Sequence, residues 1–415
     1  MSRSHRTAIA VALATGACSP SAATERGDEL LPGAVVERTA IWEDLPFAVA
    51  GCTVQRLVTP KPLALFEWAP CKGQDRCSEA VWQDEIIGED GEIGRRTSVD
   101  DDGRTVRIAV RYDSDVAQKA GVIVAREDGA IELGLRTSTA GPCNMNVPSV
   151  GHARFGVLVT RTASAGEPVR EGGLLAPLDE LATLTPFELE PMPPGSGPDE
   201  AAMGPSRWLW RFAPDQLLTV SSVDGTDPTV FAQRSSAILA LGGPTAIGEA
   251  FLFEAIERTG DGALQGSIQR SDGATAPISL IAGSPDAWVG APMFAHSHLG
   301  WQRGIGPTRL GAFDRVELWA SRLAEDSTAL EPYEVGELPA KGWSSIGAGW
   351  GRYATTGALP NELLLWDLEE NRSTSIVLPA DHAFAACPGV TRSALWVVPE
   401  LRTSPRRGLL RFACG

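Results

Sequence analysis

The chain has 415 residues, of which 43% are apolar, and it carries a formal net charge of −16 at pH 7. This length exceeds one ordinary domain, and the apolar content is ample for a buried core. Because an excess of negative charge repels phosphate backbones, we expect no nucleic-acid partner, and we interpret the acidity as a solubility feature.

The N-terminus has the pattern of a secretion signal. Arg3 and Arg6 precede an apolar run from Ala8 to Ala17, which is too short to cross a bilayer but has the length of a signal-peptide core. The run ends in small residues directly before Cys18. We predict that residues 1–17 are a signal peptide, with an ordinary cleaved signal beside a coincidental cysteine as the simpler alternative.

The segment Ala14-Thr15-Gly16-Ala17-Cys18 resembles the bacterial lipobox, with Thr15 where leucine is commonest. The resemblance implies that Cys18 carries a diacylglycerol and becomes the first residue of the mature protein. Residues 18–38 are small, polar and charged, which suits a flexible tether between membrane and domain. We therefore expect an exported protein, periplasmic or on the cell surface, anchored to a bacterial membrane through the lipid.

The cysteine count supports this expectation. Seven cysteines are present, and assigning Cys18 to the lipid leaves an even number, which in an exported chain predicts disulfides. Nearness in sequence favours Cys71–Cys77 first and Cys387–Cys414 second, which leaves Cys52–Cys143. Zinc is the competing interpretation, but the spacing from residue 71 to residue 77 is wide for a zinc pair.

Alternating apolar residues and Asp-Gly turns run through the chain. Asp-Gly favours hairpins because both residues tolerate positive φ. Residues 121–125 and 130–135 flank such a turn and are predicted as the arms of a hairpin. Residues 237–253 are predicted as two strands and a turn. The only helical candidate is Leu178–Leu184, with two turns at most, so the chain is predicted to be all-β.

One segment suggests a repeated unit. Residues 342–378 contain four short strands, the third ending in Trp366-Asp367, and a related segment surrounds Trp319. The unit resembles a blade of the WD40 or TolB-like β-propellers, although it lacks the early Gly-His pair of WD40 repeats. The resemblance implies a propeller of roughly seven four-stranded blades over residues 39–415, with a Pro/Gly-rich loop at 191–205. Two β-sandwich domains joined by 191–198 are the alternative.

Candidates for catalysis and metal binding are few. His296 and His298 form an H-x-H pair, which would need further ligands such as Asp286 or Asp314. The run 100–103 is similar to a calcium loop, but its twelfth position holds no glutamate. The sequence therefore predicts no metal, no cofactor and no identifiable catalytic residue.

Tryptophans offer a possible contact surface. Trp208, Trp210, Trp301 and Trp350 could line a carbohydrate- or peptide-binding face, although we favour a core role for most of them. The favoured function is an envelope protein whose propeller binds a protein or glycan. The alternative is an extracytoplasmic hydrolase or lyase with a site in the propeller funnel, and a purely structural envelope component is the third.

Overall fold

The fold is described from a computed structural model, which is nearly all β. No helix in the described part of the chain is long and apolar enough to cross a membrane, and one 3₁₀ turn covers Leu178–Glu180. The described residues are 41–58, 65–67, 78–81, 92–99, 105–112, 119–126, 129–136, 143–161, 170–180, 183–189, 198–212, 216–260, 262, 264–295, 297–306, 313–339, 346–347, 353–359, 362–377, 382–384, 389–390, 394–397, 399–401 and 409–413.

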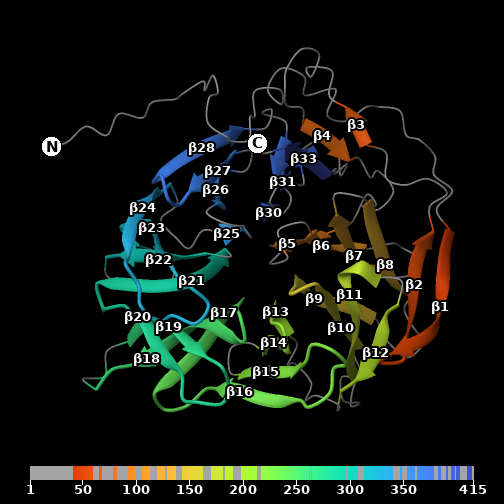
Figure 1. Ribbon diagram of the computed structural model, residues 1–415, viewed down its shortest axis with the longest axis horizontal. Coiled ribbons are helices and arrows are strands. Elements are labelled where there is room, and N and C mark those ends of the chain that lie inside the picture. Colours follow the sequence, from red (N-terminus) through yellow and green to blue (C-terminus); the bar gives the residue numbers. More distant parts are fainter. Residues whose placement is uncertain are drawn as a thin grey trace.

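Seven antiparallel sheets of four or more strands follow one another around a ring (Figure 1). We number them as blades 1 to 7. Blade 1 contains β3 (Leu65–Glu67), β4 (Ser78–Val81), β33 (Leu409–Ala413), β31 (Ala394–Val397) and β30 (Gly389–Val390). Blade 2 contains β1 (Ile41–Val49), β2 (Cys52–Val58), β8 (Gly129–Arg136), β7 (Lys119–Arg126), β6 (Thr105–Tyr112) and β5 (Glu92–Val99).

Blades 3 to 7 each have four strands in chain order. They are β9 (Cys143–Gly151), β10 (Arg154–Arg161), β11 (Arg170–Pro177) and β12 (Thr185–Glu188); β13 (Pro198–Met203), β14 (Arg207–Phe212), β15 (Gln216–Ser221) and β16 (Thr229–Gln233); β17 (Ile238–Ile247), β18 (Ala250–Arg258), β19 (Leu264–Ser271) and β20 (Ile278–Ala282); β21 (Ala287–Ala295), β22 (His298–Ile305), β23 (Arg315–Arg322) and β24 (Tyr333–Leu338); and β25 (Ile346–Gly347), β26 (Tyr353–Leu359), β27 (Glu362–Asp367) and β28 (Arg372–Val377). A separate pair joins β29 (His382–Phe384) to β32 (Pro399–Leu401).

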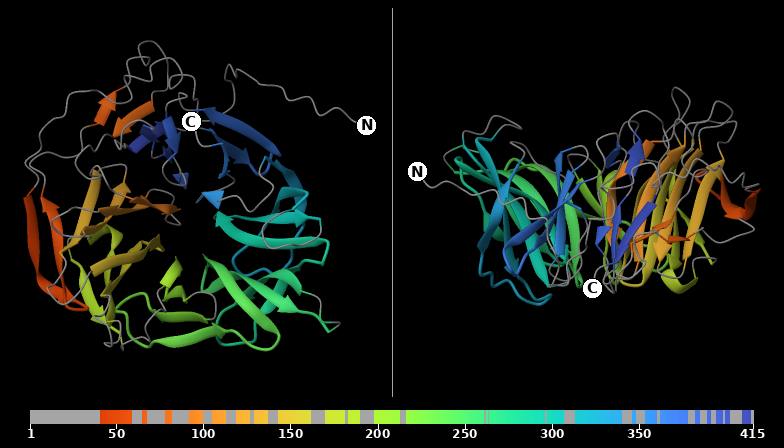
Figure 2. Two further views of the ribbon diagram at one scale, coloured as in Figure 1. Left: turned by 180° about the vertical axis from the view of Figure 1, so that it is seen from behind. Right: turned by 90° about the horizontal axis from the view of Figure 1, so that it is seen from above.

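The first strand of each four-stranded blade lies nearest the axis of the ring. Strands β5, β9, β13, β17 and β21 each contact the next one in this order, while the later strands of each blade lie progressively outward (Figures 1 and 2). This radial repetition of antiparallel sheets is the β-propeller architecture. The prediction of roughly seven blades is confirmed, and the alternative of two β-sandwich domains is wrong, because β12 and β13 belong to consecutive blades of one ring.

Blade 1 closes the ring with strands from both ends of the chain. Strand β4 pairs with β33 in antiparallel register, with Ser78 opposite Phe412 and Val81 opposite Leu409. Backbone hydrogen bonds between an early and a late strand thus hold blade 1 together. Its strand β30 contacts β26 of blade 7 and β5 of blade 2.

Several local predictions are confirmed. Strands β7 and β8 form the hairpin predicted around Asp128-Gly129, and β25 to β28 form the blade predicted over 342–378. Gly225 and Gly273 of two Asp-Gly turns have φ of 74° and 76°. The stretch 237–253 does form two strands, but Gly243 and Pro244 lie in a bulge inside β17, and the turn is at Gly248.

Outer-strand bulges fasten each of blades 4 to 6 to the blade that follows it. In β16, β20 and β24 one extra residue interrupts the register, and these residues are Phe231, Leu280 and Val335. Phe231 packs edge-on against Phe251 and Phe253 of blade 5, at centroid distances of 5.5 and 6.2 Å. A bulge also disrupts the free edge of the outer strand, which discourages pairing with other chains.

Arginines make a second recurring contact between blades. Four of them reach from one blade to the turn between the third and fourth strands of the next, where three bind backbone carbonyls and one binds a carboxylate. The contacts are Arg154 to Ser222 O (3.5 Å), Arg207 to Asp272 O (3.3 Å), Arg270 to the carbonyls of Glu325 and Ser327, and Arg322 to Glu369 (2.6 Å). The several donors of a guanidinium suit this task better than the single ammonium of lysine.

One predicted disulfide lies in the described part of the chain. Cys52 and Cys143 are bonded, with their Cα atoms 6.0 Å apart. Cys18, Cys71, Cys77, Cys387 and Cys414 lie outside the described residues, so the lipid site and the other two pairings stay predictions.

Candidate functional site

The inner strands of blades 5 and 6 share a bulge at which charged side chains of the preceding blade bind. In β17 the register shifts between Gly242 and Thr245, and in β21 it shifts between Gly290 and Met293. A proline in each segment removes a ladder hydrogen bond, which accounts for the interruption. The residue before each proline has positive φ, 52° at Gly243 and 50° at Ala291.

Carboxylates of the preceding blade accept hydrogen bonds at these bulges. The amide of Gly243 donates to Glu200 at 2.6 Å, and the amide of Ala291 donates to Glu254 at 3.1 Å. Glu200 also pairs with Arg211 at 3.4 Å. The bulge therefore presents N–H groups that buried carboxylates satisfy.

Glycines let these side chains approach the inner strands closely. A Cβ on Gly242 would lie 2.8 Å from the Arg211 guanidinium, and one on Gly290 would lie 2.8 Å from the Glu254 carboxyl group. Burial raises the pKa of Glu254; the Ala291 amide lowers it and the charge of Glu200 raises it further. Glu200, Arg211 and Glu254 form a charged network beside these bulges, and their partners give them a structural role.

A second cluster lies between blades 6 and 7. His298 is 1% exposed, its Nδ1 is 2.9 Å from the hydroxyl of Ser297, and its Nε2 is 3.7 Å from Glu369 Oε1. Arg322 binds the same Glu369 oxygen at 2.6 Å. Burial, then Glu369, raises the pKa of neighbouring Tyr333, while Arg322 lowers it.

This cluster has the order hydroxyl, imidazole and carboxylate that nucleophilic catalysis uses. Its position argues for a structural role. Glu369 follows β27 in the turn before β28, so its contacts with His298 and Arg322 repeat the arginine contacts that join the other blades.

Glu171 is the most isolated buried charge in the described chain. It is 0% exposed, and neither carboxyl oxygen has a hydrogen-bond partner among the described residues. It shares a face of β11 with Gly173 and Leu175, and Leu175 packs with Trp208 and Trp210 of blade 4. Burial raises the pKa of Glu171 to about 7, so the carboxyl group is half protonated near neutral pH.

The predicted metal candidates are not brought together. Among the described residues no group of three or more His, Cys, Asp or Glu side chains could hold a metal ion. His296 and the run 100–103 lie outside the described residues. A Cβ on Gly306 would contact Asp314 at 2.6 Å, whereas Asp286 approaches Gly306 only through its backbone carbonyl.

Three of the four tryptophans that could line a binding face are buried. Trp208, Trp210 and Trp301 are at most 2% exposed, so they belong to the core and do not line a binding face. Trp350 lies outside the described residues. Sequence reasoning missed Glu171, Glu200, Arg211 and Glu254, although the paired segments Gly242-Gly243-Pro244 and Gly290-Ala291-Pro292 could have marked the bulges.

No protein-family model and no curated protein matches this chain. Solved structures resemble it at low identity. The β-propeller domain of the Trilobed protease from Pyrococcus furiosus is 9% identical, with 77% of this chain and 93% of that chain covered and a TM-score of 0.48. YCF48 from Cyanidioschyzon merolae is 10% identical, with 80% and 98% covered and a TM-score of 0.44.

An acylaminoacyl peptidase from Pyrococcus horikoshii is 9% identical, with 80% of this chain covered and a TM-score of 0.49. This chain spans about half of that peptidase, 54% of its length. These likenesses carry no argument about activity. The propeller assignment follows from the sheet order, and the chain is a seven-bladed β-propeller.

Glu171 generates a prediction about pH. Its pKa is raised from 4.5 to about 7 on folding, so the folded state holds the proton more tightly than the unfolded state. The stabilisation that Glu171 contributes to the folded state is fully present below pH 4.5, and it is lost as the pH rises through 7. Relative to Glu171→Gln, the wild-type free energy of unfolding should fall by about 3 kcal/mol between pH 4.5 and pH 8.

Urea unfolding of both proteins at several pH values measures this difference. Exposed Glu334 on β24 supplies the control, and Glu334→Gln should keep the wild-type slope. Parallel pH profiles for wild type and Glu171→Gln would show that the buried carboxyl group has an ordinary pKa.

Proposed function

We propose that this protein is an exported, lipid-anchored envelope protein whose propeller is a scaffold for binding a protein partner. The anchor part of the proposal has its support in the sequence, from the signal-like residues 1–17, the lipobox-like residues before Cys18 and the tether-like composition of residues 18–38. The resulting location is periplasmic or at the cell surface.

The exposed apolar side chains carry the binding part of the proposal. Among the residues whose side chains the structure describes, four large hydrophobic residues stand exposed, and they lie in blades 4 and 5: Val223 (55% exposed), Val230 (48%), Leu264 (40%) and Ile278 (53%). Val230 and Ile278 occupy the outermost strands of two neighbouring blades, β16 and β20. Val223, Val230 and Ile278 lie in or near the turns between the third and fourth strands of these two blades, whereas Leu264 begins β19 at the other end. Single exposed residues are ordinary, but three at matching ends of adjacent blades favour a contact surface there.

Two further observations favour a protein over a glycan and a scaffold over an enzyme. Carbohydrate sites use exposed aromatic platforms, and the tryptophans suited to that role are buried where the structure describes them. Glu200 and Glu254 each bind the backbone of the next blade, and Arg211 pairs with Glu200, so these charges stabilise the ring.

A hydrolase is the second candidate, and the Ser297–His298–Glu369 arrangement favours it. A serine hydrolase would need Ser297 to be activated by His298, which lies at hydrogen-bond distance. Specific labelling of Ser297 by a fluorophosphonate probe, absent from Ser297→Ala, would support this candidate. Because Glu369 also binds Arg322 in a contact between blades, we favour the scaffold.

The anchor is tested by replacing the lipid-bearing residue. Cys18→Ser should leave the precursor unlipidated and shift the protein out of the detergent phase in Triton X-114 partitioning, because the thiol is the acceptor of the lipid. Cys387→Ser removes a cysteine elsewhere, one of the predicted Cys387–Cys414 pair, and should keep the wild-type partitioning. Unchanged membrane retention of Cys18→Ser would contradict the anchor.

The binding surface is tested by photo-crosslinking in intact cells. A benzophenone amino acid at position 230 or 278 should give a discrete crosslinked species of higher mass, because both positions are exposed and apolar in the native chain. Thr229 and Ser279, exposed on the same strands, are the matched control positions. Equal crosslinking at control and test positions, or none at any, would overturn the proposed surface.

A further inference from the structure

The hairpin of β1 and β2 is an addition to the propeller. Blades 3 to 7 are complete with four strands, whereas the sheet of blade 2 continues beyond β8 into β2 and β1. The pairing of β2 with β8 covers only Thr53–Arg56 against Leu133–Arg136. The hairpin therefore lies at the outer edge of the ring, where Figure 1 shows it beyond β8, and it is the first described element of the chain.

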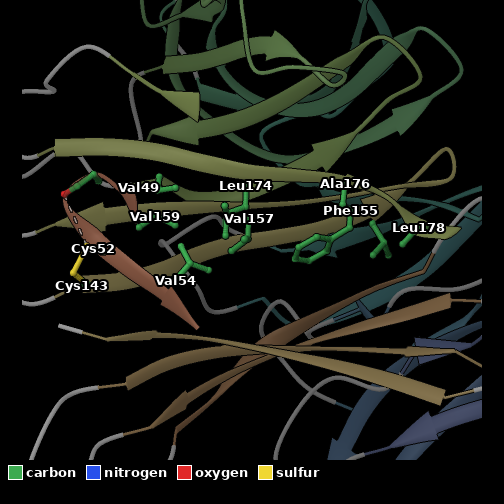
Figure 3. Packing of buried hydrophobic residues seen from close by; sticks show 12 residues of the cluster. Val49, Cys52, Val54, Cys143, Phe155, Val157, Val159, Leu174, Ala176 and Leu178 are labelled. Atoms are coloured by element: carbon green, nitrogen blue, oxygen red, sulfur yellow. Dashed lines mark hydrogen bonds between the residues drawn. A yellow bond between two sulfur atoms is a disulfide. The ribbon is translucent and has the colours of Figure 1, made fainter. Parts of the chain in front are cut away.

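The hairpin is also attached to blade 3, through apolar packing. Val49, Ala50, Cys52 and Val54 are 0% exposed and share a cluster with apolar residues of β10 and β11 (Figure 3). A Cβ on Gly172 of β11 would lie 2.7 Å from the Val49 side chain, which shows how closely the two elements pack. The hairpin thus covers apolar surface that blade 3 would otherwise expose.

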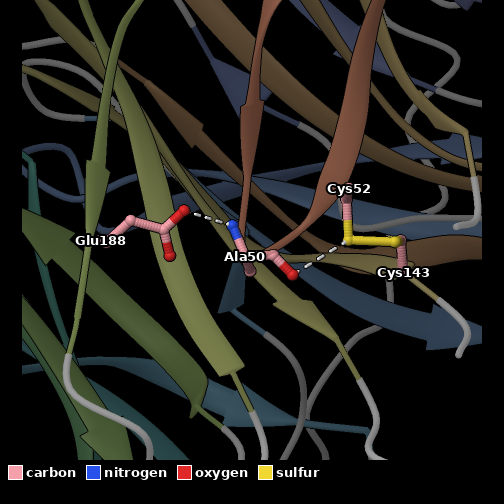
Figure 4. Close-up of a disulfide and its surroundings, with 4 residues drawn as sticks. All are labelled: Ala50, Cys52, Cys143 and Glu188. Atoms are coloured by element: carbon pink, nitrogen blue, oxygen red, sulfur yellow. Dashed lines mark hydrogen bonds between the residues drawn. A yellow bond between two sulfur atoms is a disulfide. The ribbon is translucent and has the colours of Figure 1, made fainter. Parts of the chain in front are cut away.

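One hydrogen bond and one disulfide hold the hairpin turn in place. Ala50, which has φ of 52°, donates its amide proton to Glu188 Oε1 at 2.7 Å. Two residues later Cys52 is bonded to Cys143, the first residue of β9 (Figure 4). The disulfide is the one covalent link among these contacts, and it joins positions that are 91 residues apart in sequence.

We propose that the Cys52–Cys143 disulfide is a redox-sensitive lock on the β1–β2 hairpin. Cys52 and Cys143 are both 0% exposed, so a dithiol reductant, either a small molecule or a dithiol protein, reaches the sulfurs when the edge of the hairpin transiently opens. It then donates two electrons and two protons. The Sγ–Sγ bond breaks, two thiols form, and the reductant becomes a disulfide. The hairpin then opens locally, which exposes the edge of β8 and the apolar face of blade 3, while the other blades remain folded.

Opening the hairpin would affect the connection between the propeller and the N-terminal segment. The hairpin is the element that joins the propeller to everything N-terminal of residue 41, so opening it loosens that junction first. The lock itself does not depend on the lipid anchor. If the proposed anchor is also correct, reduction makes the joint between membrane and propeller the weakest part of the molecule.

Hydrogen exchange with peptide-level mass analysis tests the lock. In Cys52→Ser/Cys143→Ser, amides of β1, β2 and β8 should exchange about tenfold faster or more than in the oxidised wild type, because local opening no longer requires breaking a covalent bond. Amides of β18 in blade 5 should keep their wild-type rates. Reducing the folded wild-type protein with dithiothreitol should give the same pattern and covers the case in which the variant does not fold. Because dithiothreitol also reduces the other predicted pairs, Cys71→Ser/Cys77→Ser and Cys387→Ser/Cys414→Ser are the controls, and each should respond to reduction as the wild type does.

Glu188→Gln supplies a second measurement. In the oxidised protein this change should alter hairpin exchange little, whereas in the cysteine double variant it should accelerate exchange further, since the remaining hydrogen bond is weakened. Unchanged exchange in β1 and β2 after reduction would overturn the lock. A uniform acceleration that includes β18 would overturn it too, because the disulfide would then support the whole ring.

Discussion

The fold depends on one constraint, that the apolar face of each blade is covered by the next blade. Phe231 of blade 4 contacts Phe251 and Phe253 of blade 5, and Val335 of blade 6 packs with Trp366 of blade 7. A chain of such contacts leaves two uncovered faces unless the ring closes. Pairing of β4 with β33 closes it, and this explains why strands from opposite ends of the sequence share blade 1.

The same constraint explains where the charges lie. A buried charge needs a partner, and between blades the available partners are the turns and bulges of the neighbouring sheet. Glu200 and Glu254 accept hydrogen bonds from the bulges of blades 5 and 6. The more exposed Arg207 and Arg322 bind a carbonyl in a turn of blade 5 and Glu369 in a turn of blade 7. Glu171 departs from this pattern, and its raised pKa is the electrostatic result.

The sequence predicted elements whose signals are local. The Asp128-Gly129 hairpin and the blade at 342–378 follow from turn chemistry and strand alternation, and the propeller followed from recognising one blade. The network of Glu200, Arg211 and Glu254 could not be predicted this way. Glu200 and Arg211 are cross-strand neighbours within blade 4, but Glu254 comes near them only when blades 4 and 5 pack. The burial of Trp208 and Trp210 could not be predicted either, since nothing in their local sequence distinguishes a buried tryptophan from one on a binding face.

The central claim is that contacts between neighbouring blades hold the ring together, and adjacent residues of β16 test it most directly. Phe231 points into blade 5, whereas Val230 is 48% exposed. Urea unfolding should show Phe231→Ala less stable than wild type by about 2–4 kcal/mol, and Val230→Ala within about 0.5 kcal/mol of wild type. Equal effects of the two substitutions would contradict the account.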